Sequence, residues 1–428
     1  MPPLSIMLKT VSSDCNLDCS YCYYRSLSKL VKKNHRISEP VLEVLVAQYM
    51  KYVADSHSAS FNWQGGEPLL AGLDFFRNAI SLETKYARAP IAISNSIQTN
   101  ATLIDDEWAE FFSSYNFLVG VSLDGPERIH NSERKDHAGK GSFERVMRGI
   151  DMLRSHNVDF NVLCVVGQHN VRHAGELTNF YQSQHLTYLQ FMPAMGFQSI
   201  EPHIRASYLI TAEEYGQFLL ELFDKWYGHG LPGFSVRMFD NLLQSALGLE
   251  NDLCTLSGNC DSGLIVEHNG DLYPCDFYIH PDYKLGNIMT KNLKITMESD
   301  KLKEFRRNKT RMPGDCAVCE WLKLCHGECP RNRESAVDDS GGRSYFCNSY
   351  RYLFESAFDR INTLARKLQN YRRFLDWQNN PKAATLQEPS PDENCPCDSG
   401  LLYAECCGNS RQRDCYLFRL PKGEFVQQ

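Results

Sequence analysis

Three cysteines near the N-terminus are spaced to hold a reactive metal cluster. They form a C-x3-C-x2-C triplet, Cys15, Cys19 and Cys22, directly after an apolar segment. A [4Fe-4S] cluster is saturated by four protein thiolates. Three thiolates at this spacing therefore predict such a cluster with one iron open to another ligand. The alternative that these residues leave open is a zinc knuckle without its fourth ligand.

Eight more cysteines lie between residues 250 and 350 and could hold two further clusters. Four of them form a C-x2-C-x5-C-x3-C run, and the whole set is Cys254, Cys260, Cys275, Cys316, Cys319, Cys325, Cys329 and Cys347. Eight thiolates complete two four-iron clusters without remainder. Two zinc sites are the alternative, because C-x2-C spacing alone favours zinc.

Four cysteines near the C-terminus predict a separate zinc site. Their spacing is C-x-C-x8-C-C, and they are Cys395, Cys397, Cys406 and Cys407. Four thiolates suffice for tetrahedral zinc, and ion binding can fold a segment of about 30 residues. We therefore predict a zinc-binding module at 395–428, joined to the rest of the chain by a Pro-containing linker at 375–394. Cysteines that bind no metal are the alternative.

The composition limits the partners of the protein. The chain has 428 residues, with 45 basic and 52 acidic side chains and a net charge of -7. This charge gives no general attraction to nucleic acid or to anionic membranes. The sequence also lacks an apolar run of about 18 residues and a basic N-terminal leader. We predict a cytoplasmic protein with no membrane or nucleic-acid partner, whose cysteines bind metal instead of forming disulfides.

The first half of the chain alternates β-like runs with helical patterns. The expected strands are 4–8, 60–64, 91–98, 117–123, 160–166 and 188–193. The clearest helices are 41–52, 143–153 with Ser142 as N-cap, and 211–227 with a capping box of Thr211 and Glu214. Strands that alternate with helices indicate right-handed crossovers and a parallel sheet. The predicted fold class is therefore α/β, a partial (β/α)6 TIM-like barrel over 1–230.

The polar motifs of the predicted barrel come directly after its strands. The cysteine triplet follows the first strand, Gly65-Gly66-Glu67 the second, Gln98-Thr99-Asn100 the third, and a loop that begins at Ser122 the fourth. In parallel barrels the C-terminal ends of the strands share one face, and that face carries the reactive groups. We therefore expect a single site at this edge of the sheet.

Residues 231–374 form a second, cysteine-rich and loop-rich region. It contains a predicted hairpin, 264–273, that turns at 268–270, and a long helix, 350–374. Asp276 follows Cys275 directly, which would place a carboxylate beside a cluster ligand. A carboxylate in a low dielectric can act as a general base, whereas an Asp in a loop is otherwise a turn cap.

The run CNLDCSYCYY, from Cys15 to Tyr24, resembles the signature of radical S-adenosylmethionine enzymes. The resemblance implies that S-adenosylmethionine chelates the open iron and is cleaved, by one electron from the cluster, to a 5′-deoxyadenosyl radical. It also implies the cofactor contacts. These are Gly65, Gly66 and Glu67 at the methionyl amino group, Ser122 and Arg134 at the ribose and the carboxylate, and Tyr21 and Met195 at the adenine.

The eight cysteines of the second region resemble the SPASM extension of radical enzymes that modify peptides and proteins. The resemblance implies an interleaved pairing and three [4Fe-4S] clusters in all. On this pairing one auxiliary cluster is held by Cys254, Cys260, Cys275 and Cys329, and the other by Cys316, Cys319, Cys325 and Cys347. The region 231–374 would then be a SPASM auxiliary-cluster domain that ends in a helix.

From residue 2 to about 374 the chain resembles the anaerobic sulfatase-maturating enzymes, in segments such as Gln64–Pro68, Ser96–Asn100 and Tyr273–Tyr278. This implies oxidation of a Cys or Ser in a sulfatase, within a Cys/Ser-x-Pro-x-Arg motif, to Cα-formylglycine without molecular oxygen. Asp276 would be the base, an auxiliary cluster would accept the second electron, and an electron donor such as a flavodoxin or ferredoxin would supply the first. The tail resembles the SEC-C motif, and an export or nascent-chain partner is expected there.

Two other functions fit parts of the same sequence. One is a related SPASM enzyme that oxidises or cross-links a different peptide. The other is a multi-cluster electron carrier without catalytic activity. A carrier would need neither the Gly65-Gly66-Glu67 motif nor a barrel, and it would not cleave S-adenosylmethionine.

Overall fold

In the computed structural model, most of the chain is arranged around one sheet of ten strands. The structure describes residues 4–24, 35–56, 58–88, 90–195, 206–260, 263–334, 342–378, 389–397 and 399–409. The strand order is β10-β9-β8-β1-β2-β3-β4-β5-β6-β7, and β1 to β6 are parallel neighbours in chain order. Their bounds are β1 Ser5–Lys9, β2 Ser58–Gln64, β3 Ala92–Thr99, β4 Leu118–Ser122, β5 Phe160–Val166 and β6 Tyr188–Pro193. These are the six predicted strands, and the partial barrel is confirmed.

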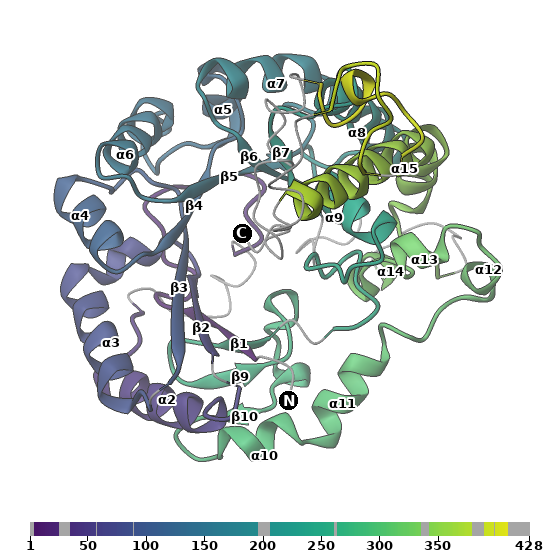
Figure 1. Ribbon diagram of the computed structural model, residues 1–428. Coiled ribbons are helices and arrows are strands. Elements are labelled where there is room, and N and C mark those ends of the chain that lie inside the picture. The colour runs from purple at the N-terminus through teal and green to yellow at the C-terminus, as the bar shows by residue number, and fades with distance from the viewer. Residues whose placement is uncertain are drawn as a thin grey trace.

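Helices cover the outer face of this curved sheet, as Figure 1 shows. They are α2 Glu39–Tyr52, α3 Leu73–Tyr86, α4 Asp106–Ser114, α5 Glu127–Glu133, α6 Phe143–Ser155, α7 Ala174–Ser183, α8 Ala212–Tyr227 and α9 Arg237–Ala246. Alternate residues of each strand point outward into the core, as with Ala59, Phe61 and Trp63 of β2, which are at most 1 % exposed. A near-continuous apolar layer thus fixes the barrel and leaves its strand ends free for polar loops.

The N-terminal ends of two helices show which predicted capping interactions form. At α8 the predicted capping box is present, because the Glu214 amide donates to Thr211 Oγ1 (3.1 Å) and the Thr211 amide donates to Glu214 Oε2 (2.9 Å). Ser142 also occupies the N-cap position of α6, but its hydroxyl does not cap the helix. It donates instead to the carbonyl of Arg134 (2.9 Å) and so ties α6 to the C-terminal end of α5.

The cysteine-rich region continues the barrel sheet. The predicted hairpin forms as β8 Leu264–Val266 and β9 Asp271–Tyr273, and β10 Gly286–Asn287 pairs with β9. On its other side β8 pairs in parallel with β1, which the sequence patterns did not predict. At the far edge β7, Ser235–Val236, pairs with β6. Five short helices follow: α10 Leu293–Met297, α11 Asp300–Arg307, α12 Gly314–Ala317, α13 Leu322–Cys325 and α14 Pro330–Glu334.

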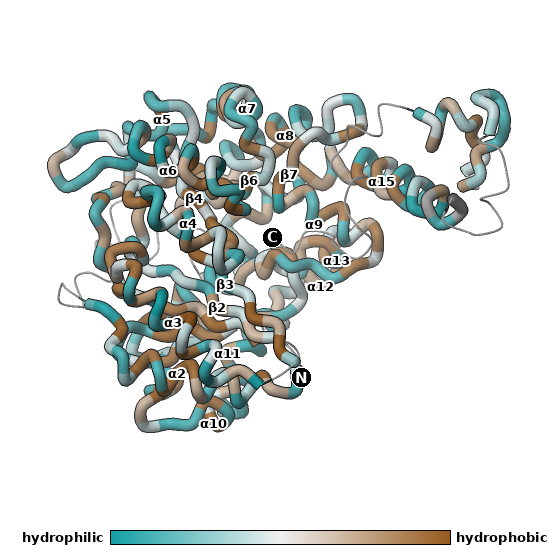
Figure 2. The backbone as a smooth tube through the Cα atoms, turned by 60° about the vertical axis from the view of Figure 1, so that its left-hand side comes forward, coloured by the Kyte–Doolittle hydropathy of each residue, from teal (hydrophilic) through white to brown (hydrophobic). Residues whose placement is uncertain are grey.

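The last helix, α15 Cys347–Gln378, is longer than the predicted 350–374. It packs on α8 and α9 and extends away from the barrel (Figure 2). Residues 375–378, predicted as linker, are therefore helical, while 379–388 and Cys415 lie outside the described residues. Among the described helices none is both long enough and apolar enough to cross a membrane.

Candidate active site

The loop after β1 carries the cysteine triplet. Cys19 is buried, and Cys15 and Cys22 are half-buried. Burial raises the pKa of the Cys19 thiol to about 12, so a thiolate at this position requires a nearby positive charge. The Leu17 amide donates to Cys15 Sγ (3.4 Å), and Asn100 Nδ2 lies 3.7 Å from the same sulfur. Three partly or fully buried sulfurs on one loop, one of them with N–H donors beside it, fit the ligands of a four-iron cluster.

The two glycines after β2 allow the cysteine loop to lie directly on this strand end. Gly65 and Gly66 have φ values of 97° and 50°. A Cβ on Gly66 would stand 1.9 Å from the carbonyl oxygen of Asp14, and one on Gly65 would stand 2.8 Å from that of Ser12. Side chains at either position would therefore displace the loop that leads into Cys15. Contact of these glycines with a methionyl amino group stays a prediction.

Glu67 ties the ends of β2 and β3 together. Its Oε1 accepts hydrogen bonds from the Leu69 amide (3.0 Å) and the Thr99 hydroxyl (2.8 Å), and its Oε2 accepts from the Asn100 amide (2.7 Å). The side chain is fully buried, and burial raises its pKa to about 7. Gly66 keeps partial exposure, so its backbone is the part of this motif that a ligand reaches most easily.

Arg134 is paired with an aspartate that the sequence analysis did not single out. Its Nε and Nη2 donate to Asp124 Oδ2 (2.8 Å) and Oδ1 (3.1 Å), and both residues are buried. Burial alone would raise the pKa of Asp124, but Arg134 and His169 hold it well below its usual range. The guanidinium fork expected to clamp a cofactor carboxylate therefore faces Asp124. Two of its donors are engaged in this structure.

The structure brings the remaining predicted cofactor residues to the same strand ends. Tyr21 donates to Asp124, stacks on His169 with ring centroids 5.7 Å apart, and belongs to one apolar cluster with Cys19 and Ala194. Ser122 ends β4 and accepts a hydrogen bond from Gln98 (3.1 Å). Met195 directly follows Ala194 and is partly buried against the main core.

Asp276 lies where the barrel meets the cysteine-rich region. It forms an ion pair with Lys9, the last residue of β1, whose side chain is fully buried. Tyr23 donates to Asp276 Oδ2 (2.5 Å), and the Tyr24 hydroxyl lies 3.4 Å from Oδ1 and accepts from Lys9. The carboxylate itself is 12 % exposed. Three side chains thus fix one nearly buried carboxylate, and Lys9 was missed because a single lysine at a strand end gives no local signal.

The eight cysteines of the second region lie in two groups. Burial raises the pKa of Cys329 to about 12, and its negative charge interacts with that of Cys254 and Cys275. Lys309 lies within electrostatic range of Cys254, Cys260 and Cys329. Cys325 interacts in the same way with the other group, which comprises Cys316, Cys319 and Cys347. These interactions are compatible with the two predicted ligand sets, and both the sets and their clusters stay a prediction.

The four cysteines of the tail are gathered much more tightly. All are buried, and their Sγ atoms lie within 4.8 Å of one another, with 3.4 Å between Cys397 and Cys406. Of all groups of metal-ligating side chains in the described ranges, this one alone is gathered so closely. Four sulfurs at such distances suit one tetrahedral ion. The group packs on Phe374 of α15, whose ring lies 5.6 Å from that of Tyr403.

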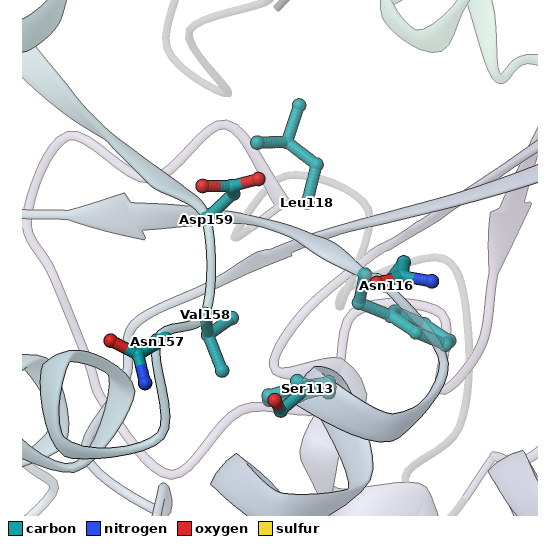
Figure 3. Close-up of a pocket in the computed structure, with 8 residues that line it drawn as sticks. Ser113, Asn116, Leu118, Asn157, Val158 and Asp159 are labelled. Carbon is teal, nitrogen blue, oxygen red and sulfur yellow. The ribbon is translucent and has the colours of Figure 1, made fainter.

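A cavity of about 250 Å³ lies away from all these residues (Figure 3). Its walls come from the segments before β4 and β5, with Ser113, Asn116, Asn157 and Asp159 as polar groups. This is the N-terminal edge of the sheet, opposite the strand ends that carry the cysteine triplet. The cavity is therefore separate from the candidate active site.

Comparisons with known proteins agree with this division of the chain. Residues 10–180 match the family model described as the Radical SAM superfamily. Residues 258–320 match SPASM, an iron-sulfur cluster-binding domain, and residues 393–409 match the SEC-C motif. Together the partial barrel and these matches define a radical S-adenosylmethionine enzyme with a SPASM domain.

Individual relatives narrow the class. A cysteine-type anaerobic sulfatase-maturating enzyme of Clostridium perfringens is 40 % identical over 373 residues, which cover 86 % of this chain and all of the relative. A serine-type enzyme of Bacteroides thetaiotaomicron is 36 % identical over 387 residues, covering 86 % of this chain and 92 % of the relative. The chain belongs to the anaerobic sulfatase-maturating enzymes.

Solved structures show the same fold. Native anSMEcpe with bound AdoMet and Cp18Cys peptide is 37 % identical, with a TM-score of 0.78 over 85 % of this chain and 99 % of that chain. Streptococcus suis SuiB bound to S-adenosylmethionine, at 16 % identity and a TM-score of 0.55, covers 80 % of this chain and 76 % of its own. The second likeness is one of fold alone.

Proposed function

We propose that this protein oxidises a Cys or Ser of a sulfatase, within a Cys/Ser-x-Pro-x-Arg motif, to Cα-formylglycine without molecular oxygen. The observation that carries the proposal is the Lys9–Asp276 pair, which sets a carboxylate between the loop of the cysteine triplet and that of Cys275. The identity of 36–40 % to sulfatase-maturating enzymes over 86 % of the chain supports the same activity.

The residues at the strand ends fit S-adenosylmethionine and a four-iron cluster. Cys15, Cys19 and Cys22 would hold the cluster. The backbone at Gly65 and Gly66, against which the cysteine loop packs, would hold the methionyl end of S-adenosylmethionine. When bound, the cluster and S-adenosylmethionine together would supply an organic radical that removes a hydrogen atom from the target Cβ. Arg134 would reach the cofactor carboxylate by giving up part of its bidentate contact with Asp124, while His169, 3.7 Å from Asp124, stays beside it.

Asp276 supplies the base of the reaction. Conversion of the target residue to an aldehyde or thioaldehyde releases one hydrogen atom, one proton and one electron. The Asp276 carboxylate takes the proton, and Lys9 together with Tyr23 holds it in place for that transfer. From a serine the product is the aldehyde. From a cysteine the thioaldehyde is hydrolysed, with loss of the sulfur as hydrogen sulfide.

Each ligand group has its own proposed metal. We assign one auxiliary [4Fe-4S] cluster to Cys254, Cys260, Cys275 and Cys329, the other to Cys316, Cys319, Cys325 and Cys347, and zinc to Cys395, Cys397, Cys406 and Cys407. Metal analysis of the purified protein tests this directly. About twelve irons and one zinc per chain are expected, and a value near eight irons per chain would show that one of the three proposed clusters is absent.

The partners follow from this chemistry. A flavodoxin or ferredoxin in the cytoplasm would supply the electron that starts each turnover. The tail, 389–409, would recruit the enzyme to nascent chains or to the export machinery before a sulfatase folds. Leu401 and Leu402 of this tail are 48 % and 40 % exposed, so their side chains are available to a partner. Leu401→Ser with Leu402→Ser should lower sulfatase activation in cells and leave peptide oxidation intact, and unchanged activation would reject this role.

One anaerobic experiment tests the main proposal. The reconstituted protein is incubated with S-adenosylmethionine, a reductant and a peptide with Cys-x-Pro-x-Arg or Ser-x-Pro-x-Arg, and the products are weighed by mass spectrometry. Formylglycine is expected. Release of 5′-deoxyadenosine without any change in either peptide would instead support a SPASM enzyme with another substrate.

Two variants test the base. Asp276→Asn should still cleave S-adenosylmethionine but lose most of the aldehyde, because the amide cannot take a proton. Asp282→Asn is the matched control, since Asp282 lies in the same loop region and its side chain is 82 % exposed. Full aldehyde formation by Asp276→Asn would remove this residue from the mechanism.

A further inference from the structure

A buried lysine lies beside one of the two cysteine groups of the second region. Lys309 is fully buried, and its Nζ donates to the carbonyl oxygens of Cys254 (3.2 Å), Thr255 (3.3 Å) and Glu328 (2.8 Å). Each acceptor belongs to a predicted cluster ligand or to its neighbour in sequence. Lysine is almost never fully buried unless its charge is paired.

No carboxylate of the described residues lies within ion-pair distance of Lys309. The negative groups that act on Lys309 are Glu328 and the thiolates of Cys260, Cys329 and Cys254. Glu328 is itself buried and accepts hydrogen bonds from Asn332 (2.7 Å) and Ser344 (2.8 Å). The charges that face Lys309 are therefore those of Glu328 and of the cysteine group beside it.

A second buried cation lies on the same group. Arg331 is 8 % exposed, two residues after Cys329, and its guanidinium is 3.6 Å from the centroid of the Phe277 ring, two residues after Cys275. It interacts with the negative charges of Cys254, Cys275 and Cys329. The acid nearest to this loop, Asp276, is already balanced by Lys9. Two buried cations, Lys309 and Arg331, therefore lie beside this group, whose Cys254 is itself exposed.

The other cysteine group has a different environment. Its nearby arginines, Arg343 and Arg351, have side chains 35 % and 48 % exposed, and each is paired with a carboxylate, at 4.0 Å and 3.7 Å. Arg333 also faces this group; it is half-buried and, like Lys309, donates to carbonyl oxygens, including that of Gly327 (2.7 Å). Charges that are exposed and paired are screened by water and salt.

We infer that Lys309 and Arg331 raise the reduction potential of the cluster held by Cys254, Cys260, Cys275 and Cys329 above that of the other auxiliary cluster. Reduction adds one negative charge to a cluster, and a buried cation stabilises that charge far more than a solvated one. The inference rests on the proposed function only in placing four-iron clusters at these cysteines. The electron and the proton from the substrate would then both be received within one loop, at the cluster of Cys275 and at Asp276.

The test is a redox titration followed by electron paramagnetic resonance. The full chain carries Cys15→Ala, Cys19→Ala and Cys22→Ala, so that only the auxiliary clusters are observed. Adding Lys309→Met should make one of them at least about tenfold less reduced at a given potential, a shift of about 59 mV to more negative values, and leave the other unchanged. Lys323→Met is the matched control, because Lys323 is exposed, and it should move neither potential.

Two further variants separate charge from structure. Lys309→Met leaves three carbonyl oxygens without their donor, so Lys309→Arg, which keeps the charge, should restore the potential. Arg331→Gln keeps all three bonds of Lys309 and should also shift the first potential negatively. If Arg331→Gln and Lys309→Met both retain eight irons, as expected for two four-iron clusters, and leave both potentials in place, the inference is wrong. A failure of the wild type to oxidise sulfatase peptides would reject the proposed function and leave these potentials unaffected.

Discussion

The two edges of the barrel sheet handle polar groups in opposite ways. At the C-terminal edge Lys9, Glu67, Asp124 and Arg134 are all buried and each is bound by named partners. At the N-terminal edge the polar residues of the cavity, such as Asn116 and Asp159, are exposed to water. The difference teaches that buried, paired charge marks the reactive edge of this protein, whereas the cavity at the other edge does not.

Burial explains why only one edge has this character. A charge taken out of water is costly, and a buried pair returns that cost only when its geometry is good. The ion pair of Asp124 and Arg134 meets this condition with two bonds of 2.8 and 3.1 Å. Groups at the cavity keep their hydration and contribute little to stability. Charges that are retained inside at such a cost are candidates for function, and the substitution of Lys9 below removes one of them.

The largest effect is expected from Gly66→Ala at the C-terminal edge. The new Cβ would stand 1.9 Å from the Asp14 carbonyl oxygen, at a φ of 50°, so the cysteine loop must move. We expect loss of S-adenosylmethionine cleavage and a fall from about twelve irons to about eight. Gly233→Ala is the control, since nothing lies within 4 Å of its Cβ. Twelve irons and normal cleavage in Gly66→Ala would show that the loop does not depend on this contact.

The next effect is expected from Lys9→Met. Without the ammonium group, Asp276 loses its ion pair, while the three cysteines of the barrel cluster are untouched. Formylglycine formation should fall about 100-fold, within the range typical of a general base, while 5′-deoxyadenosine is still released. The ratio of the two products measures the uncoupling. Lys9→Arg keeps the charge and should recover much of the yield, whereas equal losses in both variants would point to packing alone.

Local patterns predicted the parts of this site that repeat or that bind metal. The strands, the hairpin at 264–273, the cysteine triplet and the tail cysteines depend on spacing within short segments, whereas the pairing of the eight other cysteines was implied by the resemblance to the SPASM extension. The ion pair of Lys9 and Asp276 could not be predicted, because it depends on β8 pairing with β1 across most of the chain. A parallel pairing of that kind leaves no mark in either segment alone. Contacts between distant segments therefore needed the structure.

Arg134 shows the same limit within a single β4–α5 segment. Its type suggested a carboxylate clamp, and Asp124 was available in the sequence only ten residues earlier. The position of the loop that begins at Ser122, at the end of a strand, does not indicate which residue Asp124 pairs with. The structure supplies that partner, because Asp124 precedes the short helix α5 and Arg134 follows it, and both side chains enter one buried space. A sequence pattern that only assigns residues to strand ends cannot predict which of their side chains form an ion pair.

A smaller effect is expected from Glu83→Gln, which tests whether buried charge alone marks function. Glu83 is buried on α3, accepts from Asn95 (2.9 Å), and is far from the cysteine loops in sequence. Burial raises its pKa from 4.5 to about 7. Its contribution to stability is therefore complete below pH 4.5 and is lost as the pH rises through 7, a change of about 3 kcal/mol at most.

The measurement is the difference in thermal stability between Glu83→Gln and the wild type at pH 5 and pH 8. The glutamine cannot ionise, so the variant should gain on the wild type as the pH rises, by about 1 to 3 kcal/mol. Peptide oxidation should stay unchanged. A difference that does not vary with pH would mean that this acid ionises normally inside the core, and lost activity would extend the reactive region beyond the strand ends.

The smallest effect is expected from Asp159→Asn at the cavity of the N-terminal edge. The side chain is exposed, and only its backbone carbonyl holds the sheet, by accepting from the Val119 amide (3.0 Å). The variant keeps that bond, so stability should change by no more than about 0.5 kcal/mol and peptide oxidation should be normal. Activity assays and thermal melts check both values. A clear loss of peptide oxidation would assign the cavity a function and remove the contrast between the two edges.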